Sequence, residues 1–286
     1  MTQLDRRQTS VMTLIAATTL WGFFSAGLAL FGSGTVGPAV ALGAAVPLLV
    51  LAVAAGRGPL RDLRAHPKTF LVLGFLEAVN ITLYAAALAI GPTPVVVALH
   101  LTSPIILLLG ALLGRRRPLD ARAITEIALV LAAIVLVSMR PGTTVSTAQA
   151  IAGCALAFGS AVSVAALITL VARASARRGD PTVAASLQLG VAGVLTLPYL
   201  LVGTANPGQL LIEFGLGALL LGPGFALYWR AMRTTDAATA GVIGLNEAIV
   251  AWTLIAALDH ASMSIWLLAA GGLIVIAIVL EQDARL

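Results

Sequence analysis

Three polar side chains recur within an otherwise apolar segment at residues 69–90. Glu77, Asn80 and Tyr84 occupy positions i, i+3 and i+7, a spacing that places them on one face of an α-helix. A carboxyl group in the middle of such a segment is costly unless it is paired or faces water. We interpret Glu77 as a proton-exchanging carboxyl and Asn80 and Tyr84 as hydrogen-bonding groups for a polar substrate. The alternative is a structural carboxyl that hydrogen-bonds to a neighbouring helix.

A second carboxyl of this kind is Glu247, which follows Asn246 near the middle of the apolar segment at 236–257. Carboxyl groups from two separate segments could bind an ammonium group of a substrate or relay protons between them. The alternative is a bond between Glu247 and the backbone near Pro104. We predict a functional role for both Asn246 and Glu247.

Further candidates lie in the apolar segments at 11–31 and 94–114. His100 has a side chain that titrates near neutral pH, and Thr102 follows it closely. Trp21 offers an aromatic wall for a binding site. For His100 and Trp21 the alternative is ordinary packing. Tyr228 lies near the end of the segment at 211–231, where we expect an interface anchor rather than a gate.

Two prolines, Pro104 and Pro223, interrupt apolar segments at 94–114 and 211–231. A proline inside a helix removes one backbone hydrogen bond and bends the chain away from the preceding turn. Within a bilayer, such a break is tolerated only where it faces protein or water. We therefore predict helix breaks at both prolines, next to a site.

Other polar residues are expected to be structural. Glu126 and Glu213 lie near segment ends, which predicts pairing or exposure at an interface. Cys154 is the only cysteine, and the three histidines occupy separate segments. The chain therefore offers no set of metal ligands, no nucleophile and base pair and no nucleotide-binding loop. We expect no metal, no cofactor and no enzymatic activity.

Composition indicates the class of protein that must position these residues. Hydrophobic residues make up 59% of the chain and charged residues only 10%, and the mean hydropathy is +1.02. Soluble domains have about 25% charged residues. The chain is therefore predicted to be an all-α integral membrane protein. Its net charge of +5 lies in short loops between apolar runs, which argues against nucleic-acid binding.

Hydropathy divides the chain into ten predicted membrane spans, which lie at 11–31, 36–55, 69–90, 94–114, 121–139, 148–171, 182–202, 211–231, 236–257 and 264–281. An even number of spans places both termini on one side. All of the 17 Lys and Arg residues except Arg140 fall on that side, including the triplet at 115–117. By the positive-inside rule we expect both termini in the cytoplasm.

A shift of 143–144 residues aligns helix spacing and loop lengths in the two halves of the chain, 1–143 and 144–286. It pairs Pro104 with Glu247 and Asn80 with Pro223. Because five spans is an odd number, the second half begins on the opposite face of the membrane. We therefore predict one transmembrane domain built from two inverted five-helix repeats, a plan common among secondary transporters.

Several motifs carry a family resemblance. They are Thr102-Ser103-Pro104, the loop Arg115-Arg116-Arg117-Pro118-Leu119-Asp120, and Gly153-Cys154-Ala155-Leu156-Ala157. Together with the paired ten-helix halves, they resemble the EamA family of the drug/metabolite transporter superfamily, and most closely its threonine and homoserine exporter branch. This resemblance implies export of a small polar metabolite, an amino acid or a derivative.

The leading interpretation is a secondary transporter that works by alternating access in the cell (cytoplasmic, inner) membrane. A passive channel or another non-transport membrane protein is the main alternative, and an intramembrane enzyme is the weaker one. Expected partners are a small-molecule substrate and membrane lipid. Protons are the candidate coupling ion, and a second copy of the chain is a candidate partner.

Overall fold

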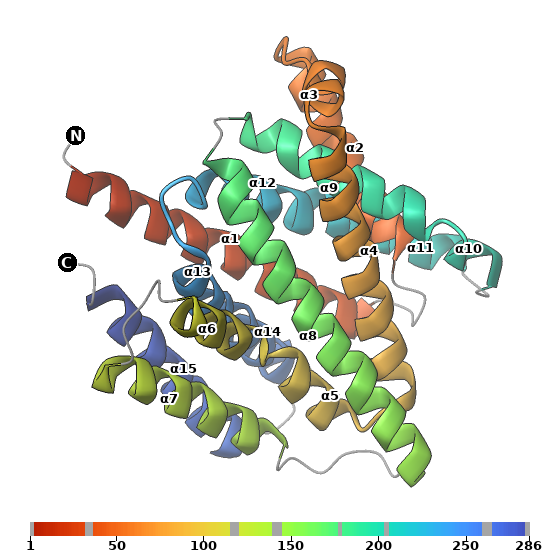
Figure 1. The fold of residues 1–286 in the computed structure, drawn as a ribbon. Coiled ribbons are helices and arrows are strands. Elements are labelled where there is room, and N and C mark those ends of the chain that lie inside the picture. The colour runs from red at the N-terminus through yellow and green to blue at the C-terminus, as the bar shows by residue number, and fades with distance from the viewer. Residues whose placement is uncertain are drawn as a thin grey trace.

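The computed structural model describes residues 3–31, 37–114, 120–138, 145–176, 179–202, 206–258 and 265–283. Within these ranges every regular element is a helix (Figure 1). The arginine triplet at 115–117, the following Pro118 and Leu119, and Arg140 lie outside the described residues.

The helices in chain order are α1 (Gln3–Phe31), α2 (Pro38–Ala54), α3 (Pro59–Ala65), α4 (Pro67–Ile90), α5 (Thr93–His100), α6 (Ser103–Leu113), α7 (Ala121–Ser138), α8 (Thr147–Ser175), α9 (Pro181–Thr196), α10 (Tyr199–Val202), α11 (Pro207–Leu216), the π-helix η1 (Gly217–Leu221), α12 (Gly222–Ala231), α13 (Ala237–Gly244), α14 (Asn246–Leu258) and α15 (Ile265–Asp283). Local sequence explains many of the starts. Proline stands in the first turn of α2, α4 and α9, where its missing N–H is not needed. The side chains of Asp180 and Asp236 accept backbone N–H groups at the starts of α9 and α13.

Seven helical stretches in the described part of the chain are long and apolar enough to cross a bilayer, which makes this a multi-pass membrane protein. They are Gln8–Phe31, Pro67–Ile90, Val95–Leu113, Thr147–Ser175, Pro181–Leu201, Pro207–Ala231 and Ala237–Ile255. The predicted spans at 36–55, 121–139 and 264–281 coincide with α2, α7 and α15, which are outside this set. Helix α2 has 17 residues, about 26 Å of helix, and bends by 108° into α3. The total of ten spans therefore stays a prediction.

Besides the end of Pro181–Leu201, where α9 gives way to α10, three of these stretches are interrupted. The chain leaves helical geometry between α5 and α6, and Pro104 lies in the first turn of α6. Pro223 likewise lies in the first turn of α12, directly after η1, so the stretch from α11 to α12 contains a π-helical turn. A third interruption, at Leu245 between α13 and α14, has no proline and was not expected from the sequence.

The helices pair in a regular way. Helix α1 packs on α12 and α14, while α8 packs on α4 and on α5 and α6. Helix α2 packs on α9, and α7 packs on α15. In Figure 1 the pair α7 and α15 forms one edge of the molecule, and α2, α9 and α11 lie toward the opposite edge. The core lies between them and is lined mainly by aliphatic side chains and by Phe225, Tyr228 and Trp229.

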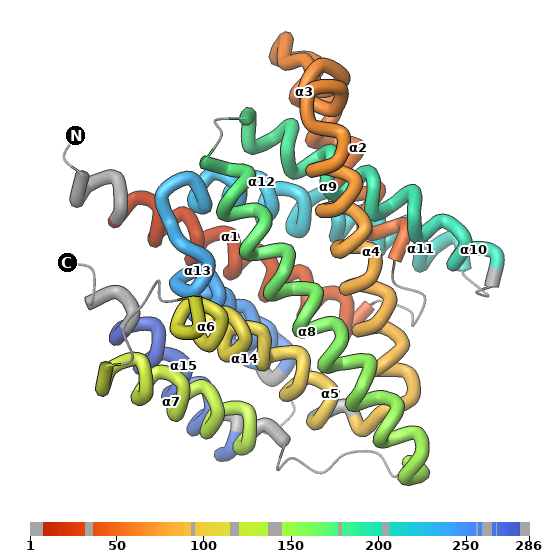
Figure 2. The backbone as a smooth tube through the Cα atoms, viewed as in Figure 1, coloured from red at the N-terminus to blue at the C-terminus, as the bar shows by residue number. Residues whose placement is uncertain are grey.

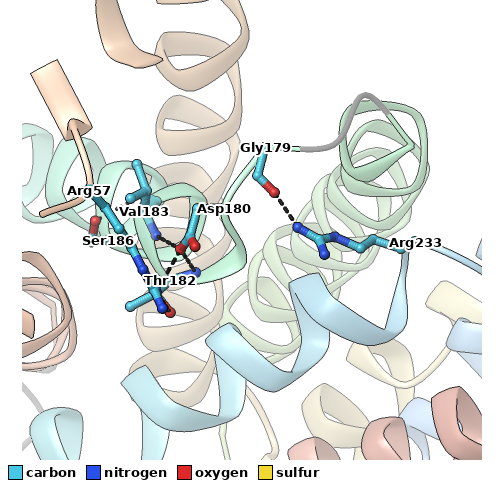
Figure 3. Close-up of polar contacts among 7 residues, drawn as sticks. All are labelled: Arg57, Gly179, Asp180, Thr182, Val183, Ser186 and Arg233. Carbon is cyan, nitrogen blue, oxygen red and sulfur yellow. Dashed lines mark hydrogen bonds and ion pairs between the residues drawn. The ribbon is translucent and has the colours of Figure 1, made fainter. Parts of the chain in front are cut away.

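Loops that are far apart in sequence meet at one end of the bundle (Figure 3). Arg57, between α2 and α3, donates to Asp180 at 2.9 Å and to Thr182 at 3.0 Å. Arg233, after α12, donates to the carbonyl of Gly179. The coloured parts of α1 and α15 that are nearest the two termini lie on the same side of the molecule (Figure 2). The ten-span prediction assigns all of these loops to the side that carries the termini.

Candidate functional site

The carboxyl of Glu77 is held in a buried chain of hydrogen bonds across α4, α9 and α12. Gln188 donates through Nε2 to Glu77 Oε2 at 2.9 Å, and Trp229 donates through Nε1 to Gln188 Oε1 at 3.0 Å. Their side chains are only 1–5% exposed. The amide of Gln188 donates to Glu77 and accepts from Trp229, so it holds both of these side chains in place. Gln188 and Trp229 were missed by sequence analysis, although a glutamine within an apolar segment was an available signal.

A second chain of contacts joins the other polar residues of α4 to α5 and α8. Ser160 donates to Asn80 Oδ1 at 2.7 Å, and His100 Nδ1 lies 2.9 Å from the Ser160 oxygen. A hydroxyl has one proton, so His100 must carry its own proton on Nδ1 when Ser160 donates to Asn80. The imidazole also stacks on Tyr84, with ring centroids 4.1 Å apart. The structure thus brings Asn80, Tyr84 and His100 together.

Glu247 is positioned by α1. Its Oε1 accepts a hydrogen bond from Ser25 at 2.6 Å. The neighbouring Asn246 donates to Thr18 at 3.1 Å and to Thr19 at 3.0 Å. The interruption at Leu245 directly precedes these residues, and it lets α14 start with its first two side chains against α1. The partner of Glu247 is therefore Ser25, not the backbone near Pro104 that we considered as the alternative.

The two carboxyls belong to one polar centre. Glu247 is close enough to Glu77 and to Tyr84 for its charge to act on both. Glu77 acts in the same way on Tyr228. Two ionised carboxylates in such low-dielectric surroundings repel each other, so a bound cation or a shared proton would stabilise the pair. The arrangement suits the binding of an ammonium group or the exchange of protons.

An aromatic cluster lies beside this centre. The ring of Trp21 in α1 is 4.9 Å from that of Phe225 and 5.1 Å from that of Tyr228, both in α12. Tyr228 is 4% exposed, so the expected interface anchor is wrong: this side chain is buried. Among the described residues, neither Trp21 Nε1 nor the Tyr228 hydroxyl has a hydrogen-bond partner. An unsatisfied buried donor costs about 1–3 kcal/mol.

The residues at the helix breaks have a different surrounding. Thr102 donates to the carbonyl of Leu99 at 2.6 Å, so its hydroxyl serves the backbone at the break. Leu101 and Leu245, from the α5–α6 and α13–α14 breaks, line the same narrow apolar pocket. Val130, Ala133, Ile134, Trp252 and Ile274 complete its wall. Pro223 lies instead one residue before Gly224, on which the Trp21 indole rests.

Two acidic residues differ from their expected exposure. Glu126 is fully buried and forms an ion pair with Arg122, with Arg122 Nε 3.2 Å from Glu126 Oε1. This ion pair is the pairing that was expected, and the side chain is buried rather than exposed at an interface. Glu213 is also fully buried, although it lies in the second turn of α11. Among the described residues, no cluster of His, Cys, Asp and Glu side chains could hold a metal ion.

Comparison with known proteins identifies the family of one part of the chain. Residues 151–280, from α8 to α15, match the EamA-like transporter family. This confirms the expected EamA resemblance over that stretch, whereas the threonine and homoserine exporter branch stays a prediction. The stretch contains Ser160, Gln188, Trp229 and Glu247.

Solved structures of the same fold exist, and 27 of their chains match. One, described only as "Crystal structure of protein", aligns over 96% of this chain and 98% of its own length, with a TM-score of 0.76 and 20% sequence identity. At that identity the similarity shows the fold alone. No curated protein matches the chain.

Proposed function

We propose that this multi-pass membrane protein, which carries an EamA transporter-family domain at residues 151–280, is a secondary transporter of a small polar metabolite, an amino acid or a derivative. The observation that carries the proposal is that two carboxyls, Glu77 and Glu247, lie among the packed helices. One comes from α4 and the other from α14, and each is held by a side chain from a helix remote in sequence. Two such carboxyls between helices are costly unless they bind a ligand or a proton.

The helix contacts support a plan of two repeats, 1–143 and 144–286, within one domain. If α1 is matched with α8, α2 with α9, and α4 with α11–α12, the contacts of one half reproduce those of the other. Thus α1 packs on α12 and α14, as α8 packs on α4 and α5–α6. Under the same matching, each of the contacting pairs α2–α9 and α7–α15 consists of a helix and its counterpart in the other half. Two halves that pack symmetrically around a central site can rock against each other, which is the basis of alternating access.

The helix breaks support the same plan. A shift of 144 places the break at Leu101 on the break at Leu245, and both residues line one narrow apolar pocket. Interrupted helices at matching positions are typical of transporter binding sites. We assign Glu77, Asn80, Tyr84, His100, Asn246 and Glu247 to substrate binding or coupling, with Trp21 in the wall. Thr102, Pro104 and Pro223 shape the breaks.

The remaining parts of the proposal concern direction and setting. We place the protein in the cell membrane with both termini in the cytoplasm, because basic residues gather in the loops that meet there, Arg57 and Arg233 among them. Export is the proposed direction, and protons are the proposed coupling ion. The family match agrees with a transporter rather than an enzyme.

The proposal is tested by efflux from proteoliposomes that contain the purified protein. Each member of a panel of radiolabelled amino acids, amines, sugars and nucleosides is loaded and its release is followed with and without a pH gradient. We expect saturable release of one class, accelerated by the gradient. Unsaturable release of many solutes at similar rates would indicate a channel, and no release above empty liposomes would refute the transporter.

A further inference from the structure

Two buried donors of the aromatic cluster, Trp21 Nε1 and the Tyr228 hydroxyl, have no hydrogen-bond partner in the described part of the chain. They come from α1 and α12, and their rings are in contact, with centroids 5.1 Å apart. Both groups can donate, and the indole cannot accept. A pair of donors of this kind is satisfied by one group that offers oxygen acceptors.

The donors lie next to both carboxyls. On α1, Ser25 follows Trp21 by one helical turn and donates to Glu247. On α12, Trp229 directly follows Tyr228 and reaches Glu77 through Gln188. The charge of Glu77 also acts on Tyr228. Trp21 therefore lies on the helix that holds Glu247, and Tyr228 lies beside the residue that is linked to Glu77.

We infer that Trp21 and Tyr228 bind the carboxylate of a zwitterionic substrate whose ammonium group is held by Glu77 and Glu247. This inference rests on the proposed transport function and specifies its substrate class as amino acids with both charged groups free. A simple anion would be repelled by Glu77 when it reached Tyr228. A simple cation would satisfy the carboxylates but would leave both donors unpaired.

Gly224 is part of this subsite. A side chain at this position would start 2.5 Å from Trp21 Nε1, so glycine allows the indole to lie directly on the α12 backbone. The adjacent Pro223 has no N–H to offer, and so the donors at this place come from side chains. The sequence Gly222-Pro223-Gly224 thus orients the indole as well as interrupting the helix.

The experiment compares matched ligands on the purified full-length protein. Equilibrium binding is measured for a panel of L-amino acids, and for the tightest of them also for its methyl ester and its decarboxylated amine. Trp21→Phe and Tyr228→Phe keep the rings and remove only the donors. Tyr199→Phe in α10 and Trp266→Phe in α15 are the matched controls, because both side chains are exposed and lie outside the cluster.

We expect the wild-type protein to bind the amino acid at least tenfold more tightly than the ester or the amine. Each donor variant should weaken amino-acid binding about tenfold, because it loses a hydrogen bond to the charged carboxylate. Binding of the ester should stay unchanged, because the ester has no carboxylate to lose this bond. Without ligand, the donor variants should be as stable as the wild type or more so, because an unsatisfied buried donor is removed. The controls should keep wild-type binding.

Three results would overturn the inference. The first is equal binding of amino acid and ester by the wild type, and the second is an unchanged preference in both donor variants. The third is the absence of binding to every amino acid in the panel. If the liposome assay then shows saturable release of another class, the transporter proposal stands without the zwitterion subsite. If no solute is released, transport itself fails.

Discussion

At the scale of single residues, the two carboxyls of the polar centre differ in how they are held. Glu77 receives an amide hydrogen bond from Gln188, which is itself held by Trp229. Among the described residues, Glu247 accepts a hydrogen bond from the hydroxyl of Ser25 alone, and it is partly accessible. A carboxyl with fewer fixed donors loses less when it becomes protonated. Glu247 is therefore the member of the pair that we expect to exchange protons more readily.

The first prediction concerns the charge of both carboxyls. Glu77→Gln and Glu247→Gln keep size and hydrogen bonding, because glutamine retains an acceptor for Gln188 or Ser25, but they remove titration. Both variants should accumulate in the membrane and lose the acceleration of efflux by a pH gradient. Initial rates in proteoliposomes at several gradients measure this effect.

The control for this prediction is Asp62→Asn, which alters a carboxyl in the short α3 at the loop end of the molecule. Its rates should match those of the wild type. If both glutamine variants show wild-type rates at every gradient, Glu77 and Glu247 are structural carboxyls.

The second prediction concerns Gln188 as a positioning residue. Gln188→Leu leaves one oxygen of Glu77 and the Trp229 N–H buried without their partner, at about 1–3 kcal/mol for each group. Thermal unfolding in detergent should show a clear loss of stability. Adding Trp229→Phe should recover part of it, because the unsatisfied donor is then absent.

Ser186→Ala is the matched control on the same helix, since Ser186 is buried and bonds only to the carbonyl of Val183 within its own helix. It should change stability little. Equal losses in Gln188→Leu and Ser186→Ala, with no recovery in the double variant, would contradict the positioning role.

At the scale of helices, the interruptions position the site. The break at Leu245 starts α14 with Asn246 and Glu247 facing α1, and the π-helical turn η1 precedes the Gly224 contact with Trp21. In continuous helices these side chains would point in other directions, because each residue along a helix is rotated by about 100° from the one before it. The breaks therefore select which side chains meet, in addition to giving the chain a hinge.

The third prediction tests the close contact of α12 with α1. Gly224→Ala places a methyl group against the rigid indole of Trp21, so we expect a loss of about 1–3 kcal/mol from overpacking and a weaker transport activity. Gly215→Ala in α11 is the control, because no atom lies within 4 Å of the added methyl group. It should be neutral or slightly stabilising. Equal stability of the two alanine variants would show that Trp21 has room to move.

At the scale of the whole molecule, one end of the bundle is tied by contacts between distant loops. Arg57, Asp180, Gly179 and Arg233 join the loops that follow α2, α8 and α12. Arg57 and Asp180 are 42% and 30% exposed, so their ion pair contributes at most about 1 kcal/mol. A weak tie of this kind can break without unfolding, as a transporter needs when this end opens.

The fourth prediction concerns the orientation of this end. In a Cys154→Ser background, Arg61→Cys in α3 should react with a membrane-impermeant thiol reagent only after cells are permeabilised. Ala148→Cys, at the start of α8, should react in intact cells. The reverse pattern of labelling would place the termini outside, and labelling of both sites in intact cells would contradict the ten-span topology.

The sequence by itself determined the class of protein, because the length and hydropathy of a segment are local properties. It also identified Glu77, Asn80, Tyr84, His100 and Glu247, since a polar group within an apolar segment is visible without any knowledge of its neighbours. The two prolines predicted where two of the breaks would fall, at Pro104 and at Pro223. These features depend on residues within a few turns of each other.

Only the tertiary structure decided how these residues are paired. Gln188 is 111 positions from Glu77, and Ser25 is 222 positions from Glu247, so no local pattern connects them. The same reason explains the wrong expectations for the exposure of Glu213 and Tyr228. Their distance from a segment end suggested an interface, but burial depends on which neighbouring helix covers the side chain. Packing between helices, and not position along one helix, sets that outcome.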